Sequence, residues 1–209
     1  MSTKPEASAF AAAYGRGEAQ VVWTRLIDDL ETPVSAYLKV GFGQPFAFLF
    51  ESVEGGSWRG RYSFITLKPD LVWRCFGDRA EVAQGAGIAA GDYRAEDRPA
   101  LESLRRLVEA SRIELPAELP PMAAGLFGAI GYDMIRLAEP LGPAKPDALG
   151  LPDGVMTRPS VVAVFDSVAQ EIVLITSVRP SALSAEAAYA EAAQRLADTQ
   201  AELARPLDR

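Results

Sequence analysis

Two short apolar runs near the end of the chain most limit what this sequence can fold into. Residues 160–165 read Ser-Val-Val-Ala-Val-Phe and residues 171–176 read Glu-Ile-Val-Leu-Ile-Thr, so both runs are rich in residues that favour strands. A short, largely polar segment separates them, which is the arrangement of a β-hairpin. The pair therefore predicts an antiparallel sheet.

The middle of the chain predicts an antiparallel meander. Short apolar runs are interrupted by residues that favour turns, at 68–70 (Lys-Pro-Asp) and 77–78 (Gly-Asp). The predicted strands begin at Phe46 and cover residues 62–67, 71–76 and 79–83. A Gly/Ala-rich polar segment, residues 85–97, separates the meander from the next predicted element.

Three segments predict helices. The first lies between Thr32, a good N-cap residue that is followed by proline, and Gly41, which suits a helix end. The second begins near Pro99 and the third, a long surface helix, covers about residues 184–204. The apolar faces consist of Leu101, Leu104, Leu107 and Val108 in the second helix and of Tyr189, Leu196 and Leu203 in the third. Hairpins covered by helices indicate an α+β fold with antiparallel β-meanders, not a doubly wound parallel sheet.

Residues 123–133 contain glycines at three-residue spacing, Gly125, Gly128 and Gly131. A phosphate-cradling loop is one interpretation, but no dinucleotide fingerprint or Walker lysine accompanies these glycines. Because they alternate with large apolar residues, a buried strand that lets another backbone approach closely is the preferred interpretation. A helical turn should follow, with Asp133 and Arg136 spaced to form an ion pair.

Residues 48–65 form an apolar run, a polar turn with several glycines, and a second apolar run. Glu51 and Ser52 end the first run and place a carboxylate and a hydroxyl at the sheet edge. The glycines leave Arg59 and Arg61 able to face an anion. Two interpretations remain open for this turn, a small-ligand site and an ordinary β-connection with solvated arginines.

Composition excludes several classes of function. The chain of 209 residues carries 28 acidic against 21 basic residues, a net charge of −7, and no basic run, which argues against nucleic acid and anionic membranes as partners. No stretch has the signal core or the roughly 20 apolar residues of a membrane span. The expected location is the cytoplasm.

The sequence contains no histidine, which removes Ser-His-Asp and Cys-His catalysis and imidazole metal ligands. Its acidic residues are scattered, so the chain alone is not expected to hold a metal ion. Cys75 is the only cysteine and lies in an aromatic strand, where core packing is the preferred role.

Four segments together resemble the N-terminal half of component I of anthranilate synthase, a chorismate-utilising enzyme. They occur in the family's order over about residues 18–180. The segments are Asp29 to Lys39 (DLETPVSAYLK), Phe48 to Gly56 (FLFESVEGG) with Gly60 to Ile65 (GRYSFI), Gly128 to Asp133 (GAIGYD), and Leu151 to Asp153 (LPD) with Val164 to Asp166 (VFD). The chain departs from the family at Thr66, where glycine is usual. The family also often has two adjacent glycines before Gly-Tyr-Asp, whereas here Phe127 and Ala129 flank a single glycine.

The resemblance implies conversion of chorismate to anthranilate and pyruvate, with magnesium as cofactor and ammonia from a glutamine amidotransferase partner, component II. It divides the chain into a tail, residues 1–17, and the component I N-terminal domain, residues 18–205. By this resemblance, the chorismate-binding C-terminal half would be missing. We therefore expect the chain to hold no catalytic residue and no metal ion, and to be inactive alone. Apolar surface that faces the missing half should be exposed.

By the same resemblance, this half carries part of a feedback site for L-tryptophan. Ser52 is the first candidate, because the serine of the matching family element contacts the inhibitor. Phe50 and Glu51 belong to the same element, and Glu51 could meet the ammonium group. Either Arg61 or Tyr62 is a further candidate that would complete the site. The alternative role of Arg61 is an ion pair with a nearby carboxylate.

Two other functions remain open. One is the N-terminal half of 4-aminobenzoate synthase component I, an enzyme of the same superfamily. The other is a stand-alone binding module unrelated to chorismate. The Glu-Thr-Pro-Val-Ser-Ala-Tyr-Leu-Lys stretch and the Glu-Ser-Val-Glu-Gly-Gly turn favour anthranilate synthase.

Overall fold

A computed structural model describes residues 3–27, 30–51, 60–143 and 146–207. The chain forms two compact units, each assembled from separate segments. Unit 1 comprises residues 1–68, 113–124 and 159–209, and unit 2 comprises residues 69–112 and 125–158. Two long strands contribute residues to both units.

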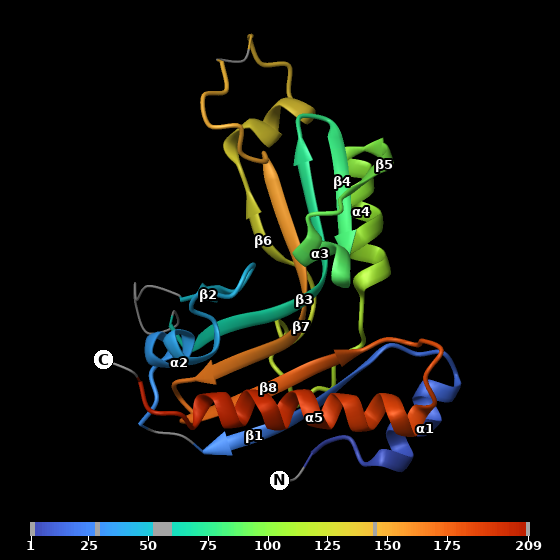
Figure 1. Ribbon diagram of the computed structural model, residues 1–209, viewed down its shortest axis with the longest axis vertical. Helices are drawn as coiled ribbons and strands as arrows, with labels where there is room; N and C mark the ends of the chain where they lie inside the picture. Colours follow the sequence, from blue (N-terminus) through green and yellow to red (C-terminus); the bar gives the residue numbers. More distant parts are fainter. Residues whose placement is uncertain (1–2, 28–29, 52–59, 144–145, 208–209) are drawn as a thin grey trace. The chain divides into compact units, whose positions relative to one another are not determined.

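The described strands hydrogen-bond in the order β1-β8-β7-β3-β4-β5, with β2 paired to β3 and β6 paired to β7 (Figure 1). Their bounds are β1 Gln20–Ile27, β2 Phe48–Phe50, β3 Tyr62–Phe76, β4 Arg79–Gln84, β5 Arg94–Pro99, β6 Phe127–Ile130, β7 Gly154–Asp166 and β8 Glu171–Val178. The β7–β8 pair is the predicted hairpin, and it is antiparallel with Val161 opposite Thr176. The pairs β1–β8, β2–β3, β3–β4, β4–β5 and β6–β7 are antiparallel as well, which confirms the predicted α+β class.

The helices are α1 Ala7–Gly15, α2 Pro33–Val40, α3 Ala86–Ala90, α4 Ala100–Ser111 and α5 Ala185–Leu203, and a 3₁₀-helix, η1, covers Tyr132–Leu137. All three predicted helices are present. Ser184 caps α5 by accepting a hydrogen bond from the backbone N–H of Ala187. The predicted ion pair in η1 is confirmed, with Arg136 Nε 2.7 Å from Asp133 Oδ1.

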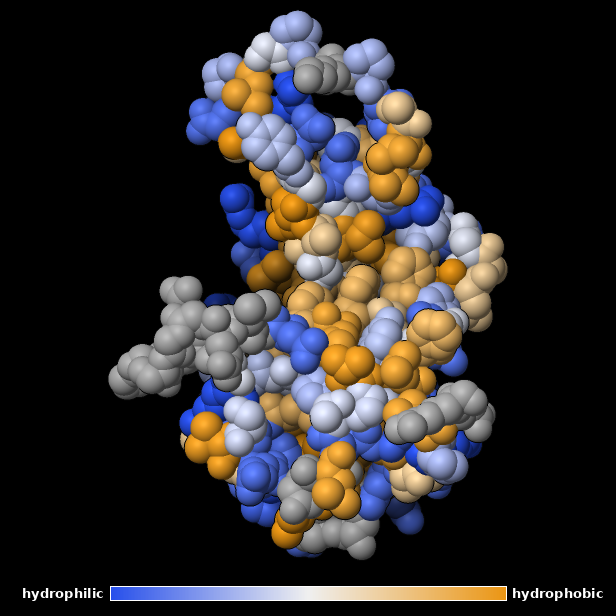
Figure 2. Space-filling model, turned by 90° about the vertical axis from the view of Figure 1, so that its left-hand side faces the viewer, coloured by the Kyte–Doolittle hydropathy of each residue, from blue (hydrophilic) through white to orange (hydrophobic). Residues whose placement is uncertain are grey.

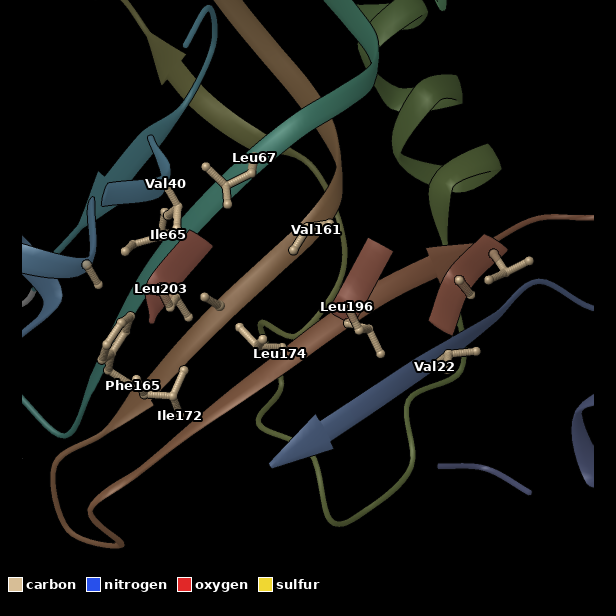
Figure 3. Packing of buried hydrophobic residues seen from close by; sticks show 14 of the residues in the cluster. Val22, Val40, Ile65, Leu67, Val161, Phe165, Ile172, Leu174, Leu196 and Leu203 are labelled. Atoms are coloured by element: carbon tan, nitrogen blue, oxygen red, sulfur yellow. The ribbon is translucent and has the colours of Figure 1, made fainter. Parts of the chain in front are cut away.

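The core of unit 1 lies between one face of its strands and three helices, α1, α2 and α5. Leu196 and Leu203 of α5 are buried against the strands, as their seven-residue spacing predicts (Figure 3). Ile65, Val161 and Leu174 meet them from three neighbouring strands (Figure 3). Burying each of these side chains contributes roughly 1.5–3 kcal/mol to stability.

The predicted caps of α2 are confirmed. The Thr32 side chain accepts a hydrogen bond from the backbone N–H of Ser35, and the Ser35 hydroxyl accepts one from the N–H of Thr32. Lys39 in the last turn forms a nearly buried ion pair with Glu31 and donates to the Leu203 carbonyl at 3.0 Å. This lysine therefore joins α2 to the C-terminal end of α5, where a positive charge is favourable.

The core of unit 2 forms where α4 packs on β4 and β5. Trp73 is fully buried, and its indole N–H donates to Ser103 of α4 at 3.0 Å. Cys75 is also fully buried, 3.1 Å from the Met134 sulfur. Burial raises the pKa of the Cys75 thiol to about 11, so the thiol stays protonated at neutral pH, as a packing role requires.

The predicted break at residues 68–70 is wrong, because β3 continues through it. On β3, the residues up to Thr66 pair with β2 and the residues from Leu71 pair with β4. Pro69 lies between these two paired stretches. A proline there removes no hydrogen bond from either ladder. Lys68 takes a left-handed backbone conformation, φ 50°, which the sequence pattern did not indicate.

Three further features differ from the sequence prediction. The segment 85–97 forms α3 and the start of β5, which were not predicted. The expected tail contains α1, whose Phe10 is fully buried in unit 1. On α4, Leu101 and Val108 are exposed, because the helix turns Ala100 and Ser103 toward the sheet instead.

Gly128 confirms the predicted close approach of two backbones, although β6 itself is buried only at Phe127. A methyl group on Gly128 would lie 1.9 Å from the carbonyl oxygen of Val155 on β7. No flexible side chain can relieve that clash, because the obstructing atoms are backbone atoms.

We expect Gly128→Ala to lower the free energy of unfolding by about 1–3 kcal/mol, measured by urea denaturation. Gly142→Ala is the matched control, because nothing lies within 4 Å of a methyl group there. Equal stability of the two variants would contradict the close approach.

Thr66, the departure from the family's usual glycine, is fully buried, and its hydroxyl has no hydrogen-bond partner among the described residues. We expect Thr66→Val, which keeps the shape and removes the hydroxyl, to raise the free energy of unfolding by about 1 kcal/mol. Thr66→Ser keeps the hydroxyl and loses the methyl group, so it should lower stability. Urea denaturation would test both, and a destabilised valine variant would show that the hydroxyl is satisfied.

Candidate functional site

Four aromatic rings lie on one face of the β2–β3 pair in unit 1. Phe50 is opposite Phe64, and Phe48 is opposite Thr66. The ring centroids of Phe48 and Phe50 are 5.9 Å apart, and those of Tyr62 and Phe64 are 6.2 Å apart. Because successive strand residues alternate between faces, these rings lie opposite the face that α5 covers.

The four predicted site residues have different outcomes. Phe50 is half-buried at the end of β2, and Glu51 follows it with an exposed side chain. Arg61 directly precedes β3, and Phe50 of β2 pairs with Phe64 of β3. The pairing of the two strands therefore brings Phe50 and Arg61 into the same part of the sheet. Ser52, the first candidate, lies outside the described residues.

Arg61 forms a bidentate ion pair with Asp166 at the end of β7. The guanidinium donates from Nε to Asp166 Oδ1 at 3.0 Å and from Nη2 to Oδ2 at 2.8 Å. Asp166 is 8% exposed, whereas the Arg61 side chain is 50% exposed. The alternative role considered for Arg61, an ion pair with a nearby carboxylate, is therefore present, and half of the side chain still faces outward.

The β7–β8 turn holds the Asp166 carboxylate in place. Its Oδ1 accepts hydrogen bonds from the backbone N–H groups of Val168 at 3.0 Å and Ala169 at 3.1 Å. Hydrogen bonding from Arg61 lowers the pKa of Asp166 in spite of its burial, and the two backbone donors lower it further. The same ion pair raises the pKa of Arg61, so both partners stay charged at neutral pH.

Two cavities of unit 1 share Arg61 and Asp166 in their linings. The first has a volume of about 220 Å³ and the second about 400 Å³. The first is lined by Glu31, Thr32, Pro33, Arg61, Ser63, Phe165, Asp166, Ser167, Gln170, Glu171 and Ile172. A cavity of this size is below the range of drug-sized ligands and suits a smaller polar molecule.

In the described part of the chain, the charged side chains that line the 220 Å³ cavity are three carboxylates and one guanidinium. Each carboxylate has a cationic partner, since Glu31 pairs with Lys39, Glu171 with Arg25, and Asp166 with Arg61. Of these three cations, Arg61 alone lines the cavity. The described lining therefore carries one cationic group among three acidic ones, together with the neutral polar side chains of Thr32, Ser63, Ser167 and Gln170.

Sequence reasoning did not assign Asp166 to the site, although Val164 to Asp166 was one of the matching segments. A detectable signal was present, because an aspartate that ends a strand can accept hydrogen bonds from the N–H groups of the following turn. Its pairing with Arg61 was not detectable, since the two residues are far apart in the sequence and meet only through the sheet.

The described residues do not fit a magnesium site, because no three acidic or cysteine side chains among them gather closely enough to hold a metal ion. None of the described helices combines the length and the apolar character that a membrane span needs.

Curated relatives match nearly the whole chain. Anthranilate synthase component 1 of Cereibacter sphaeroides is 48% identical over 197 residues, which cover 94% of this chain and 39% of the relative. The same component of Synechocystis is 35% identical, covering 97% of this chain and 40% of the relative. The chain belongs to the anthranilate synthase component I family. It spans about two fifths of the length of these relatives.

A solved structure agrees with the family assignment at the level of the fold. Component I of anthranilate synthase from Streptococcus pneumoniae matches with a TM-score of 0.54 and 23% identity, covering 87% of this chain and 37% of that chain. No protein-family model matches the chain. The resemblance drawn from four sequence segments is thus confirmed by relatives that extend well beyond those segments.

The ion pair at the candidate site should make stability depend on pH. Because the pKa of Asp166 is lower in the folded state, its contribution is fully present above the unfolded value of about 3.9 and is lost as pH falls through the folded value. We expect Asp166→Asn to be less stable than the unchanged chain at pH 7, by a difference that shrinks below about pH 4. Urea denaturation between pH 7 and pH 3 would measure it, and a difference independent of pH would contradict the ion-pair contribution.

Proposed function

We propose that this chain is the N-terminal regulatory and scaffolding half of anthranilate synthase component I. The observation that carries the proposal is the 48% identity over 94% of the chain to a relative of which the chain covers 39%. In the complete enzyme, chorismate is converted to anthranilate and pyruvate, with ammonia supplied by a glutamine amidotransferase, component II. The chorismate and magnesium sites belong to the remaining part of the enzyme.

Exposed apolar side chains support a scaffolding role. Figure 2 shows hydrophobic residues at the surface in several places on one face. In unit 2, Leu149 is 79% exposed, Leu151 63% and Ile130 56%. Contiguous apolar surface is commonly covered by a partner domain or protein, which in this proposal is the C-terminal half.

The regulatory role places a tryptophan site at the end of β2 and the start of β3. The aromatic rings of the β2–β3 pair can border an indole ring, Glu51 can meet an ammonium group and Arg61 a carboxylate. Ser52 contributes a hydroxyl. Inhibition requires that tryptophan bind one state of the enzyme more tightly than another, so the site must be completed by the C-terminal half.

The activity is tested by joining the chain to a chorismate-binding C-terminal half of component I. We expect anthranilate from chorismate and ammonia, followed by its fluorescence, with activity that requires magnesium. Formation of 4-amino-4-deoxychorismate would instead assign the chain to 4-aminobenzoate synthase. Tight tryptophan binding by the 209-residue chain alone, measured by calorimetry, would favour a stand-alone binding module.

The feedback site is tested in the same complete enzyme by Ser52→Phe. We expect the tryptophan concentration for half-inhibition to rise at least about tenfold, which corresponds to roughly 1.4 kcal/mol of binding, while uninhibited turnover is kept. Ser57→Phe is a control in the same stretch of sequence. Unchanged inhibition of the Ser52 variant would remove Ser52 from the site.

A further inference from the structure

Both long strands pass from one unit to the other at a basic residue followed by proline. On β3, unit 1 ends at Lys68 and unit 2 begins at Pro69, and on β7, unit 2 ends at Arg158 and unit 1 begins at Pro159. A proline has no backbone N–H, so it cannot donate a hydrogen bond to a neighbouring strand. Each strand therefore lacks a ladder donor where it changes unit.

The outer partner of each strand also changes there. On β3, pairing with β2 reaches Thr66 and pairing with β4 begins at Leu71. On β7, pairing with β6 reaches Thr157 and pairing with β8 begins at Val161. In the described structure, the residues between these paired stretches belong to none of the four ladders, and we call these two stretches the crossings. They lack the outer ladders that stiffen the rest of β3 and β7.

One register joins β3 and β7 in both units. In unit 1 the backbone N–H of Ser167 donates to the Arg61 carbonyl at 2.9 Å, and in unit 2 the N–H of Asp153 donates to the Cys75 carbonyl at 2.8 Å. Counted from either bond along β3 in one direction and along β7 in the other, the two prolines are reached after the same number of residues. The strands therefore lose their N–H donors at one level of the ladder.

The backbone at the β3 crossing departs from a regular strand, because Lys68 has a φ of 50°, which residues other than glycine adopt rarely. The chain also passes between the units after Arg112 and before Gly125, and both places lie outside the described helices and strands. In the described chain, β3 and β7 are therefore the elements of regular structure that continue from one unit into the other.

Ion pairs hold the strands on each side of the prolines. In unit 2, Arg158 makes a bidentate contact with Asp70, from Nε to Oδ1 at 2.7 Å and from Nη2 to Oδ2 at 3.0 Å, and so joins β7 to β3. In unit 1, Lys68 donates to Glu202 of α5 at 3.3 Å. Bending is therefore directed to the few residues between these contacts.

We propose that residues 67–70 of β3 and 158–160 of β7 form a two-stranded hinge that lets units 1 and 2 move as separate bodies. Leu67 belongs to the core of unit 1 and Leu71 to the core of unit 2, so the packing of β3 changes from one core to the other across the hinge. A hinge needs only a few residues that absorb a change in φ and ψ. The inference goes beyond the proposed function and does not depend on it, since no ligand or reaction enters.

The test measures the distance between two spin labels on the full chain. One label is placed on α5 through Ala190→Cys and one on α4 through Arg105→Cys, two exposed positions in different units. Cys75 is fully buried and is not expected to react. A reference pair within unit 1, Ala190→Cys with Val168→Cys, gives the width due to the labels. We expect the distance distribution between the units to be at least about twice as wide as the reference.

Lys68→Gly tests the crossing on β3. Glycine adopts a φ of 50° without strain and reaches other conformations as easily, so the variant should widen the distribution between the units by about half. Gln170→Gly is the matched control, because Gln170 also has a positive φ, 52°, but lies in the β7–β8 turn of unit 1. It should leave the distribution unchanged.

Asp70→Asn tests the ion pair beside the hinge. Loss of the bidentate contact with Arg158 should also widen the distribution between the units. Asp133→Asn is its matched control, because it breaks the Arg136–Asp133 pair within η1 of unit 2. Should the Asp70 variant misfold, Arg158→Lys, which keeps the charge and loses the bidentate geometry, takes its place.

Three results would each overturn the inference. The first is a distribution between the units that is as narrow as the reference. The second is equal widening by the control variants and by the hinge variants, since the whole chain would then be loosened. The third is a wide distribution that no hinge variant changes, which would assign the motion to the connections at Arg112 and Gly125 instead.

Discussion

Burial of one face of the strands of unit 1 beneath α5 is the interaction on which the rest of that unit depends. Leu196 and Leu203 reach strands that come from the middle and from the end of the chain. The aromatic rings of the β2–β3 pair lie on the opposite face of these strands. Phe165 and Ile172 of the core cluster line the 220 Å³ cavity, so that cavity lies on the side of the strands that α5 covers.

Elements with a strong local signal could be predicted from the sequence. Thr32 and Gly41 bound α2 because capping is decided by neighbouring residues, and the β7–β8 hairpin followed from its β-branched runs. The continuity of β3 could not be predicted, because it depends on which strands pair on each side of Pro69. The exposed Leu101 of α4 has a similar cause, since the face that a helix buries is decided by the sheet beneath it.

The residues of the candidate site also differ in whether the sequence could predict them. Residues on the β2–β3 segment were predictable, because that segment is continuous in sequence and matches the family. Asp166 was not predictable, since it reaches Arg61 only when β7 lies beside β3. A hydrogen bond between these strands confirms that they are neighbours, because the backbone N–H of Ser167 donates to the Arg61 carbonyl at 2.9 Å. A sequence motif thus located one partner of the ion pair, and only the sheet topology identified the other.

In a chain of net charge −7, the ion pairs of unit 1 decide which charges line the 220 Å³ cavity. Lys39 and Arg25 are paired with carboxylates of the cavity lining but are not part of that lining themselves. Among the described residues, Arg61 is therefore the cation that lines the cavity. Its partner Asp166 is nearly buried and its own side chain is half exposed, an asymmetry that directs the free side of the pair outward. Because half of the Arg61 side chain faces solvent, water screens the pair, and its contribution to stability is modest.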